Sequence, residues 1–271
     1  MKLRTILSLA SLGVFTLASS QAALVGYYTL DGNFLDSSGN NNHGTLIGGA
    51  AYDGSVPGAI GAGQSVSFDG AAGTYGNIQN AAQTGGLAIT TAPSFTVAMW
   101  VNSAITGTDD RIFSEGSSSN NNPLFNIGNT NNNNAPNAGS VDVYIRAANG
   151  TAFGHAYSAG TAFDGTWRHV LFAGGTDGLL DLYIDGVFDG TFDYSAIPAF
   201  TPDTTTIGGI LRGSDCCNFN GLIDDVSLWD QDLSQGDITA LASGASALSI
   251  PEPSSLVLVL AGLTLAMRRR R

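Results

Sequence analysis

The sequence contains little lysine, little glutamate and almost no cysteine. Lysine occurs only at Lys2, and between residues 23 and 250 the single glutamate is Glu115. Charged residues make up 12% of the chain, whereas 36 of its 271 residues are glycine. This composition argues against a helical cytosolic enzyme and favours a chain rich in turns. The length is sufficient for one large domain with its own hydrophobic core.

Positive charge is scarce in the body of the chain, residues 23–250. This part holds 20 aspartates and one glutamate but only four arginines, a formal net charge of −17. So acidic a body repels nucleic-acid phosphates and anionic lipid headgroups, and nucleic acid is therefore not an expected partner. The acidity indicates a solvated, exported surface, with bound divalent cations as the alternative.

The two cysteines, Cys216 and Cys217, are neighbours in the chain. Adjacent α-carbons lie about 3.8 Å apart across a trans peptide, whereas disulfide-bonded cysteines have α-carbons roughly 4.4 to 6.8 Å apart. The chain therefore has no ordinary disulfide staple. Two states remain open, a strained ring that forms a rigid apolar projection beside Phe219, or two partly buried thiols.

The first 22 residues have the order of a secretory signal peptide. Lys2 and Arg4 form a basic start, an apolar stretch runs from Ile6 to Ala18, and small residues precede Ala23. This order is recognised by signal peptidase and predicts export of a chain that begins at Ala23.

The C-terminal end has three parts after an expected linker at residues 244–250. They are a Pro-Glu-Pro triplet, an apolar run and a basic cluster: Pro251, Glu252, Pro253, Leu256 to Met267, Arg268, Arg269, Arg270 and Arg271. This order resembles the PEP-CTERM sorting signal of Gram-negative bacteria. The resemblance implies that an exosortase-type membrane protease removes the tail and that the body reaches the cell surface or an exopolysaccharide matrix.

The length of the apolar run fits a transient signal rather than a permanent transmembrane anchor. The 14 residues from Ser254 to Met267 span about 21 Å as a helix, whereas the hydrocarbon core of a bilayer is about 30 Å thick. The terminal arginines would stay cytoplasmic, leaving the body outside. We therefore expect a transient inner-membrane association during export.

The middle of the chain reads as a three-stranded antiparallel meander. Runs from Thr166 to Ala173, Leu179 to Ile184 and Val187 to Phe192 are separated by short turns, the second of which is Asp-Gly. Asp-Gly is a strong hairpin signal because both central positions favour positive φ. Alternation places Leu180 and Leu182 on the buried face and the neighbouring aspartates outside.

Three stretches resemble laminin-G-like, concanavalin A-like jelly-roll domains. They read W-R-H-V with L-Y-I-D-G in the meander, L-D-G followed by D-S-S-G-N-N-N-H-G-T near the start, and N-G-L-I-D-D-V-S-L-W near the end. The resemblance covers residues 24–243 and implies one all-β domain, a two-sheet antiparallel jelly-roll sandwich of about a dozen strands. It also implies that the first and last strands are neighbours. We expect residues 116–137, which are rich in asparagine, to form a loop.

The loop that begins at Asp36 offers the oxygen ligands that calcium prefers. Because the resemblance places the first and last strands side by side, a structural Ca²⁺ could be shared between this loop and the last strand. The predicted ligands are Asp36, Asn40, Asp224 and Asp225. The alternative is that these side chains cap turns.

The predicted function is binding of a polysaccharide or another matrix component, without catalysis. Sandwich lectins use loop amides and aromatic rings for this purpose, and the predicted ligand-binding residues are Asn120, Asn122, Phe125, Cys216, Cys217 and Phe219. A structural or adhesive matrix protein without a saccharide site is the alternative. A glycoside hydrolase is disfavoured because it needs two facing carboxylates, and the E-x-D-x-x-E pattern of glucanases with this fold is absent.

Overall fold

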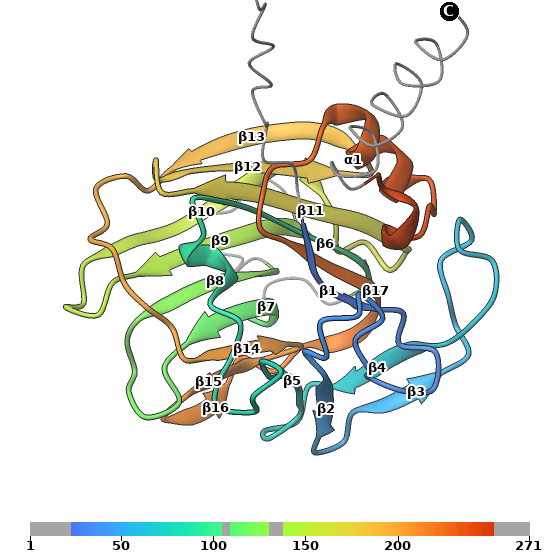
Figure 1. The fold of residues 1–271 in the computed structure, drawn as a ribbon, viewed down its shortest axis with the longest axis horizontal. Coiled ribbons are helices and arrows are strands. Elements are labelled where there is room, and N and C mark those ends of the chain that lie inside the picture. The colour runs from blue at the N-terminus through green and yellow to red at the C-terminus, as the bar shows by residue number, and fades with distance from the viewer. Residues whose placement is uncertain (1–22, 105–108, 130–137, 252–271) are drawn as a thin grey trace, which may run out of the picture.

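The computed structural model describes residues 23–104, 109–129 and 138–251. These residues form two antiparallel β-sheets packed face to face (Figure 1), which confirms the predicted sandwich. No helix among these residues is long and apolar enough to cross a membrane. The predicted signal peptide and the sorting signal beyond Pro251 lie outside the described residues.

One sheet has eight strands, and its order confirms that the first and last strands are neighbours. From one edge the strands are β13 (Val187–Asp193), β12 (Leu179–Ile184), β11 (Arg168–Gly175), β6 (Ser94–Asn102), β17 (Asn220–Trp229), β4 (Ser65–Asp69) and β3 (Ala51–Asp53), with β1 (Leu24–Tyr28) also paired to β17. The predicted meander is β11, β12 and β13, joined in antiparallel register.

The other sheet has seven strands and carries a short hairpin on its outer side. The order is β10 (Ala152–Thr161), β9 (Ser140–Arg146), β8 (Leu124–Asn129), β7 (Arg111–Gly116), β14 (Thr204–Ile207), β5 (Tyr75–Ile78) and β2 (Gly44–Ile47). The hairpin consists of β15 (Ile210–Arg212) and β16 (Ser214–Cys216), and β15 contacts β7.

The core lies between the two sheets and follows from strict alternation along the strands. On β9, Val141, Val143 and Ile145 are fully buried in the core, so Asp142 and Tyr144 point to the opposite face. Phenylalanines from both sheets meet in this layer, including an edge-to-face pair of Phe95 and Phe125 with ring centroids 5.7 Å apart. Burial of these apolar side chains holds the sheets together.

A second apolar cluster covers the outer face of the eight-stranded sheet. Helix α1 (Gln235–Ala242) packs Ile238 and Leu241 against Leu171 and Trp229, and Figure 1 shows the helix beside this sheet. The 3₁₀ turn η2 (Ala247–Ser249) continues the cover, while η1 (Ile89–Thr91) precedes β6. Residues 244–250, which we expected to be a linker, thus pack against the body, with Ala247 and Ile250 buried.

The largest departure from expectation is a strand inside the asparagine-rich segment. Residues 124–129, L-F-N-I-G-N, form β8 in the middle of the seven-stranded sheet rather than part of a loop. Phe125 and Ile127 enter the core, while Asn126 points outward. The strand forms because this alternation of apolar and polar residues fits a half-buried strand, despite the low strand propensity of asparagine.

Candidate functional site

Polar side chains form a row across the outer face of the seven-stranded sheet. Residues directly opposite each other in the strand register share one face of a sheet. From edge to edge the register aligns Thr45, Asn77, Thr206, Ser114, Asn126, Tyr144 and His155. One residue from each of the seven strands therefore contributes to a continuous polar row that faces away from the core.

The β15–β16 hairpin covers the middle of this row. The Thr206 hydroxyl donates a hydrogen bond to the Gly209 carbonyl oxygen at 2.7 Å, directly before the hairpin begins. Thr206, Ser114 and Asn126 are buried, whereas Tyr144 and His155 remain partly exposed. The hairpin thus leaves a hollow on each side, both of which open onto the same sheet face.

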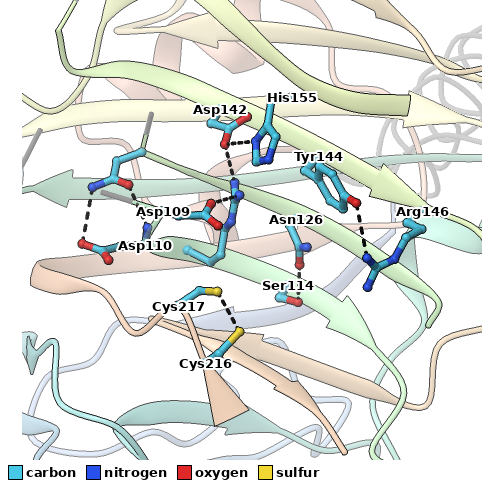
Figure 2. A network of polar contacts seen from close by, with 12 residues as sticks. Asp109, Asp110, Ser114, Asn126, Asp142, Tyr144, Arg146, His155, Cys216 and Cys217 are labelled. Atoms are coloured by element: carbon cyan, nitrogen blue, oxygen red, sulfur yellow. Dashed lines mark hydrogen bonds and ion pairs between the residues drawn. The ribbon is translucent and has the colours of Figure 1, made fainter. Parts of the chain in front are cut away.

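The hollow on the side of β8, β9 and β10 has a volume of about 160 Å³. We call it the arginine hollow, and its lining residues are Asp109, Arg111, Asn126, Tyr144, Arg146, His155, Ile210, Arg212 and Cys217. Figure 2 shows the side chains from the sheet side by side, with the two cysteines facing them. The hollow on the other side of the hairpin, about 300 Å³, is lined by uncharged polar groups such as Asn77 and by Asp203.

A buried ion-pair network forms one end of the arginine hollow. The Arg111 guanidinium lies 3.0 Å from Asp142 Oδ2 and also contacts the Asp109 carboxylate. The same Asp142 oxygen is 2.8 Å from Nδ1 of His155. Burial raises the pKa of Asp142, against the opposing effects of Arg111 and His155. The network fixes the His155 ring at the rim of the hollow.

Several buried polar atoms at the site have no hydrogen-bond partner among the described residues. They are Nε of Arg111, Oδ1 of Asp142 and Nε of Arg146. A buried polar group without a partner is costly, so such atoms in a folded protein are commonly satisfied by water, an ion or a ligand. Of these residues, Arg111 and Arg146 line the arginine hollow, where water or a polar ligand can serve as the missing partner.

Aromatic rings line the same wall. The rings of Tyr144 and His155 lie 4.8 Å apart, and the Arg146 guanidinium lies 5.7 Å from the centre of the Tyr144 ring. The Tyr157 ring is nearly parallel to His155, with centroids 6.5 Å apart. Tyr144 also contacts Arg146 through its hydroxyl at 3.3 Å. The wall thus offers ring surface together with donors at fixed positions.

The two cysteines face the sheet from the hairpin. Their Sγ atoms are 2.7 Å apart, both thiols are free, and both residues are half-buried. The hydrogen bond from Cys217 lowers the pKa of Cys216 to about 7, and the nearby Arg212 acts in the same direction. Cys217, one of the predicted ligand-binding residues, lines the arginine hollow, while Cys216 lies behind it.

The other predicted ligand-binding residues do not gather at one place. Phe125 and Phe219 are fully buried in the core, so their prediction as ligand contacts is wrong. Asn120 is exposed and Asn122 is half-buried in the turn before β8, outside the residues that line the arginine hollow. Both phenylalanines lie on strands or beside them, where alternation turns them inward.

The predicted calcium ligands Asp36 and Asn40 hold their loop against β1. Asp36 accepts hydrogen bonds from the backbone N–H groups of Tyr27 and Ser38 at 3.0 and 2.8 Å. It also accepts one from the N–H of Asn42 at 3.0 Å. Asn40 donates to the Leu24 carbonyl oxygen at 2.7 Å. In these contacts Asp36 and Asn40 cap turns of the loop, which was the alternative to calcium binding.

Asp225, a further predicted calcium ligand, and Asp36 contact opposite ends of the same residue, Tyr27. The Tyr27 hydroxyl donates to Asp225 Oδ1 at 2.5 Å, while the Tyr27 backbone N–H donates to Asp36. Ligand oxygens of one Ca²⁺ lie about 2.3 to 2.6 Å from the ion, so these two carboxylates do not share an ion in this arrangement. Asp224 is buried beside Asp225, and burial, together with the charge of Asp225, raises the pKa of Asp224 to about 8.

Within the described ranges, one group of three side chains brings metal-ligating atoms together, and the sequence did not suggest it. Asp109, Asp142 and His155 have ligand atoms within 4.8 Å of one another. Arg111 pairs with both carboxylates and offsets one of their two negative charges, so the three side chains form an ion-pair network around one guanidinium. The sequence offered one indication of this site: the stretch V-D-V-Y-I-R alternates so that Asp142, Tyr144 and Arg146 share one face of a strand.

A larger hollow than the arginine hollow lies on the outer face of the eight-stranded sheet. It has a volume of about 510 Å³, and its lining includes Asp177, Asp181, Tyr183 and Asp232. Burial and the charges of Asp177 and Asp181 raise the pKa of Asp232. No arginine lines this hollow, and none of its lining atoms is buried without a hydrogen-bond partner. It therefore lacks the features that mark the arginine hollow as a site.

The fold and the polar sheet face together define a lectin-like β-sandwich. Residues 72–239 match the sequence pattern of the concanavalin A-like lectin/glucanases superfamily. The chain therefore belongs to this superfamily, which the sequence resemblance had indicated. No curated protein sequence matches the chain.

Solved structures with the same fold include saccharide-binding and receptor-binding domains. Domain 4 of AbnA, an extracellular arabinanase from Geobacillus stearothermophilus solved with arabinotriose, is 20% identical with a TM-score of 0.59, covering 82% of this chain and 98% of that domain. The receptor-binding domain of a botulinum neurotoxin C/D mosaic serotype is 16% identical with a TM-score of 0.59, covering 82% and 51%. The chain thus spans about half of the toxin domain.

Proposed function

We propose that this protein is an exported, non-catalytic module that binds polysaccharide in the arginine hollow. The observation that supports this most strongly is the convergence of Asn126, Tyr144, Arg146 and His155 from three adjacent strands around buried polar atoms without partners. Amide, hydroxyl and guanidinium groups beside aromatic rings are suited to sugar hydroxyls. The neighbour solved with arabinotriose supports the same class of ligand.

Two buried carboxylates, Glu115 and Asp142, lack the access to a substrate that hydrolysis requires. Glu115 is fully buried, and its oxygens accept hydrogen bonds from the N–H groups of Ile89 and Thr90 and from the Thr205 hydroxyl. Asp142 is also inaccessible to solvent and paired with Arg111. A general acid must reach the glycosidic oxygen, and neither side chain is placed to do so.

Affinity electrophoresis tests the proposed function. The purified protein is run through gels that contain, one at a time, arabinan, β-glucan, dextran, alginate and polygalacturonate. We expect at least one polymer to retard the wild-type protein and Tyr144→Ala to reduce that retardation at least tenfold. Tyr183→Ala, on the outer face of the other sheet, serves as the matched control. Equal loss in both variants, or no retardation by any polymer, would contradict the proposal.

Calcium remains a proposal for the last strand, with Asp224 and Asp225 as ligands. The raised pKa of Asp224 reflects a buried carboxyl that a divalent cation would stabilise in its charged form. At pH 8, added Ca²⁺ should raise the melting temperature of the wild-type protein relative to EDTA, and Asp224→Asn should abolish that difference. An identical melting temperature with Ca²⁺ and with EDTA would refute calcium binding.

Delivery to the cell surface or the exopolysaccharide matrix rests on the two ends of the sequence. The basic and apolar start and the Pro-Glu-Pro tail with its terminal arginines support export followed by exosortase processing. Mass spectrometry of the protein from its native host should find a chain that begins at Ala23 and lacks the terminal arginines. A chain that retains both ends would exclude this route.

A further inference from the structure

The distribution of the four arginines of the body is uneven. Three of them, Arg111, Arg146 and Arg212, line the arginine hollow, and the fourth, Arg168, lies on the other sheet. The body has no lysine, and its formal net charge is −17 with the four arginines included. Three guanidinium groups outnumber the two carboxylates of this site, Asp109 and Asp142, so the hollow carries a local excess of positive charge in a chain poor in cations.

The arginines differ in whether a carboxylate of the chain neutralises them. Arg168 pairs with Asp164 at 2.6 Å and with Asp185 at 2.8 Å. Arg111 pairs with Asp109 and Asp142. These two arginines are therefore balanced within the protein.

Arg146 and Arg212 take part in no ion pair among the described residues. Arg146 donates to the Asn121 carbonyl oxygen at 2.6 Å and contacts the Tyr144 hydroxyl, and its Nε is buried without a partner. Arg212 lies beside the thiol of Cys216. The internal segments that the structure does not describe, residues 105–108 and 130–137, contain no aspartate or glutamate. No carboxylate in either segment can neutralise these two arginines.

We propose that the arginine hollow selects a sugar that carries a negative charge, a carboxylate or a sulfate group on the ring. This inference rests on the proposed saccharide-binding function and specifies its ligand. The guanidinium fork matches such groups in two parallel hydrogen bonds, which a neutral hydroxyl does not reproduce. Because the rest of the surface repels polyanions, binding of such a polymer would have to occur at this hollow rather than at a diffuse basic surface.

The geometry assigns complementary roles to the residues of the hollow. Arg146 on β9 and Arg212 on the hairpin approach the hollow from opposite sides and would hold the anionic group between them. Asn126 and the rings of Tyr144 and His155 would contact the neutral part of the sugar. Arg111 pairs with both aspartates of the site and offsets part of the repulsion that they exert on an anion.

Matched pairs of polymers test the charge of the ligand. Binding is measured in EDTA for polygalacturonate against its carboxyl-reduced form, for alginate against its carboxyl-reduced form, and for dextran sulfate against dextran. We expect the anionic member of at least one pair to bind at least tenfold more tightly than its neutral partner. The pair that shows the difference identifies carboxylate or sulfate as the recognised group.

The variants test the location. Arg146→Gln and Arg212→Gln should each weaken binding of the anionic polymer about tenfold, because each removes a charge-assisted contact. Arg168→Gln removes the same charge from the other sheet and should leave binding unchanged. An equal loss with Arg168→Gln would indicate a general effect of net charge and overturn the inference.

The remaining outcomes separate this inference from the proposed function. Equal binding to both members of a pair, weakened in both by Tyr144→Ala, would overturn the anionic ligand and leave a neutral saccharide site. Failure of every polymer to bind, with circular dichroism unchanged from a folded β-protein, would overturn both proposals.

Discussion

The outer faces of the two sheets differ in what covers them. On the eight-stranded sheet the chain supplies its own apolar cover, with helix α1 over Leu171 and Trp229. On the seven-stranded sheet a short hairpin covers only the middle of a polar row, and the two ends stay open. The first face contributes to stability through burial of apolar area, whereas the second keeps polar side chains such as Tyr144 and His155 at an open surface. This difference supports the proposed binding site on the second face.

The two histidines on strands show the same contrast. His169, on the covered side, is buried next to Trp100 with ring centroids 5.2 Å apart, and burial lowers its pKa to about 4. His155, on the open side, is partly exposed and bonded to Asp142. Sequence alone does not separate these two environments, because both histidines occur in strands with similar neighbours.

The largest expected effect is a loss of stability when the apolar packing under helix α1, on the outer face of the eight-stranded sheet, is removed. Trp229→Ala removes a side chain that is 1% exposed and packed under α1. We expect the free energy of unfolding to fall by about 3 to 5 kcal/mol, measured by urea denaturation, with polysaccharide affinity unchanged in the folded fraction. A loss of affinity at unchanged stability would reverse the assignment of the two faces.

The next effect concerns the ion pair at the open face. Arg111→Gln leaves the Asp142 carboxylate buried without its cation, and we expect a loss of about 3 kcal/mol. The double variant Arg111→Gln/Asp142→Asn removes the stranded charge and should recover more than half of that loss. Thermal melts of the two variants measure the difference. Equal melting temperatures of the single and the double variant would show that the unpaired Asp142 charge does not cause the loss.

A smaller effect is a pH dependence that arises at Asp224. Its pKa is raised to about 8 by burial and by Asp225, whereas an unfolded aspartate titrates near its ordinary value of about 3.9. Between these pH values the folded state holds a proton that the unfolded state has lost, so stability falls as pH rises from about 4 to 8. Asp224→Asn should flatten this fall, with a gain of about 2 kcal/mol at pH 8.

Melting temperatures at pH 5 and pH 8 provide the test for Asp224. The exposed Asp53→Asn variant is the control, since Asp53 lies on the edge strand β3 away from this cluster. We expect the control to keep the pH dependence of the wild-type protein. The same slope in Asp224→Asn and in the wild-type protein would show that Asp224 does not titrate in this range.

The smallest expected effect belongs to a single hydroxyl of the open face. Tyr144→Phe keeps the ring but removes the group that contacts Arg146. We expect about threefold weaker polysaccharide binding, in line with the net contribution of one hydrogen bond, and a melting temperature within about 1 °C of the wild type. Isothermal titration calorimetry measures the affinity. Unchanged binding would remove the hydroxyl from the site and leave only the ring.

The fold could be predicted from the sequence because strand periodicity and turn signals agree along most of the chain. Asp-Gly at residues 185–186 marks the hairpin between β12 and β13, and alternation around Leu180 and Leu182 gives the buried face correctly. Strand β8 was missed because its asparagines suggested a loop.

The candidate site could not be predicted to the same extent because it depends on register. Asp142, Tyr144 and Arg146 share a face by alternation alone, which the sequence shows. Their position opposite Asn126 and His155 follows from the register of β9 with β8 and with β10, which contains a shift between Ala152 and Gly154 that alternation along one strand does not reveal. The return of the hairpin over β7, which brings Arg212 to the same hollow, is a tertiary contact without a local sequence signal.

The most direct test of the central claim is a nuclear magnetic resonance titration of the arginine Nε–Hε signals. The scarcity of arginine in this chain makes these signals few, and single substitutions assign them. Addition of the polysaccharide that binds most tightly should shift the signals of Arg146 and Arg212 and leave that of Arg168 unchanged. A shift of the Arg168 signal, with those of Arg146 and Arg212 unmoved, would contradict binding at the open face of the seven-stranded sheet.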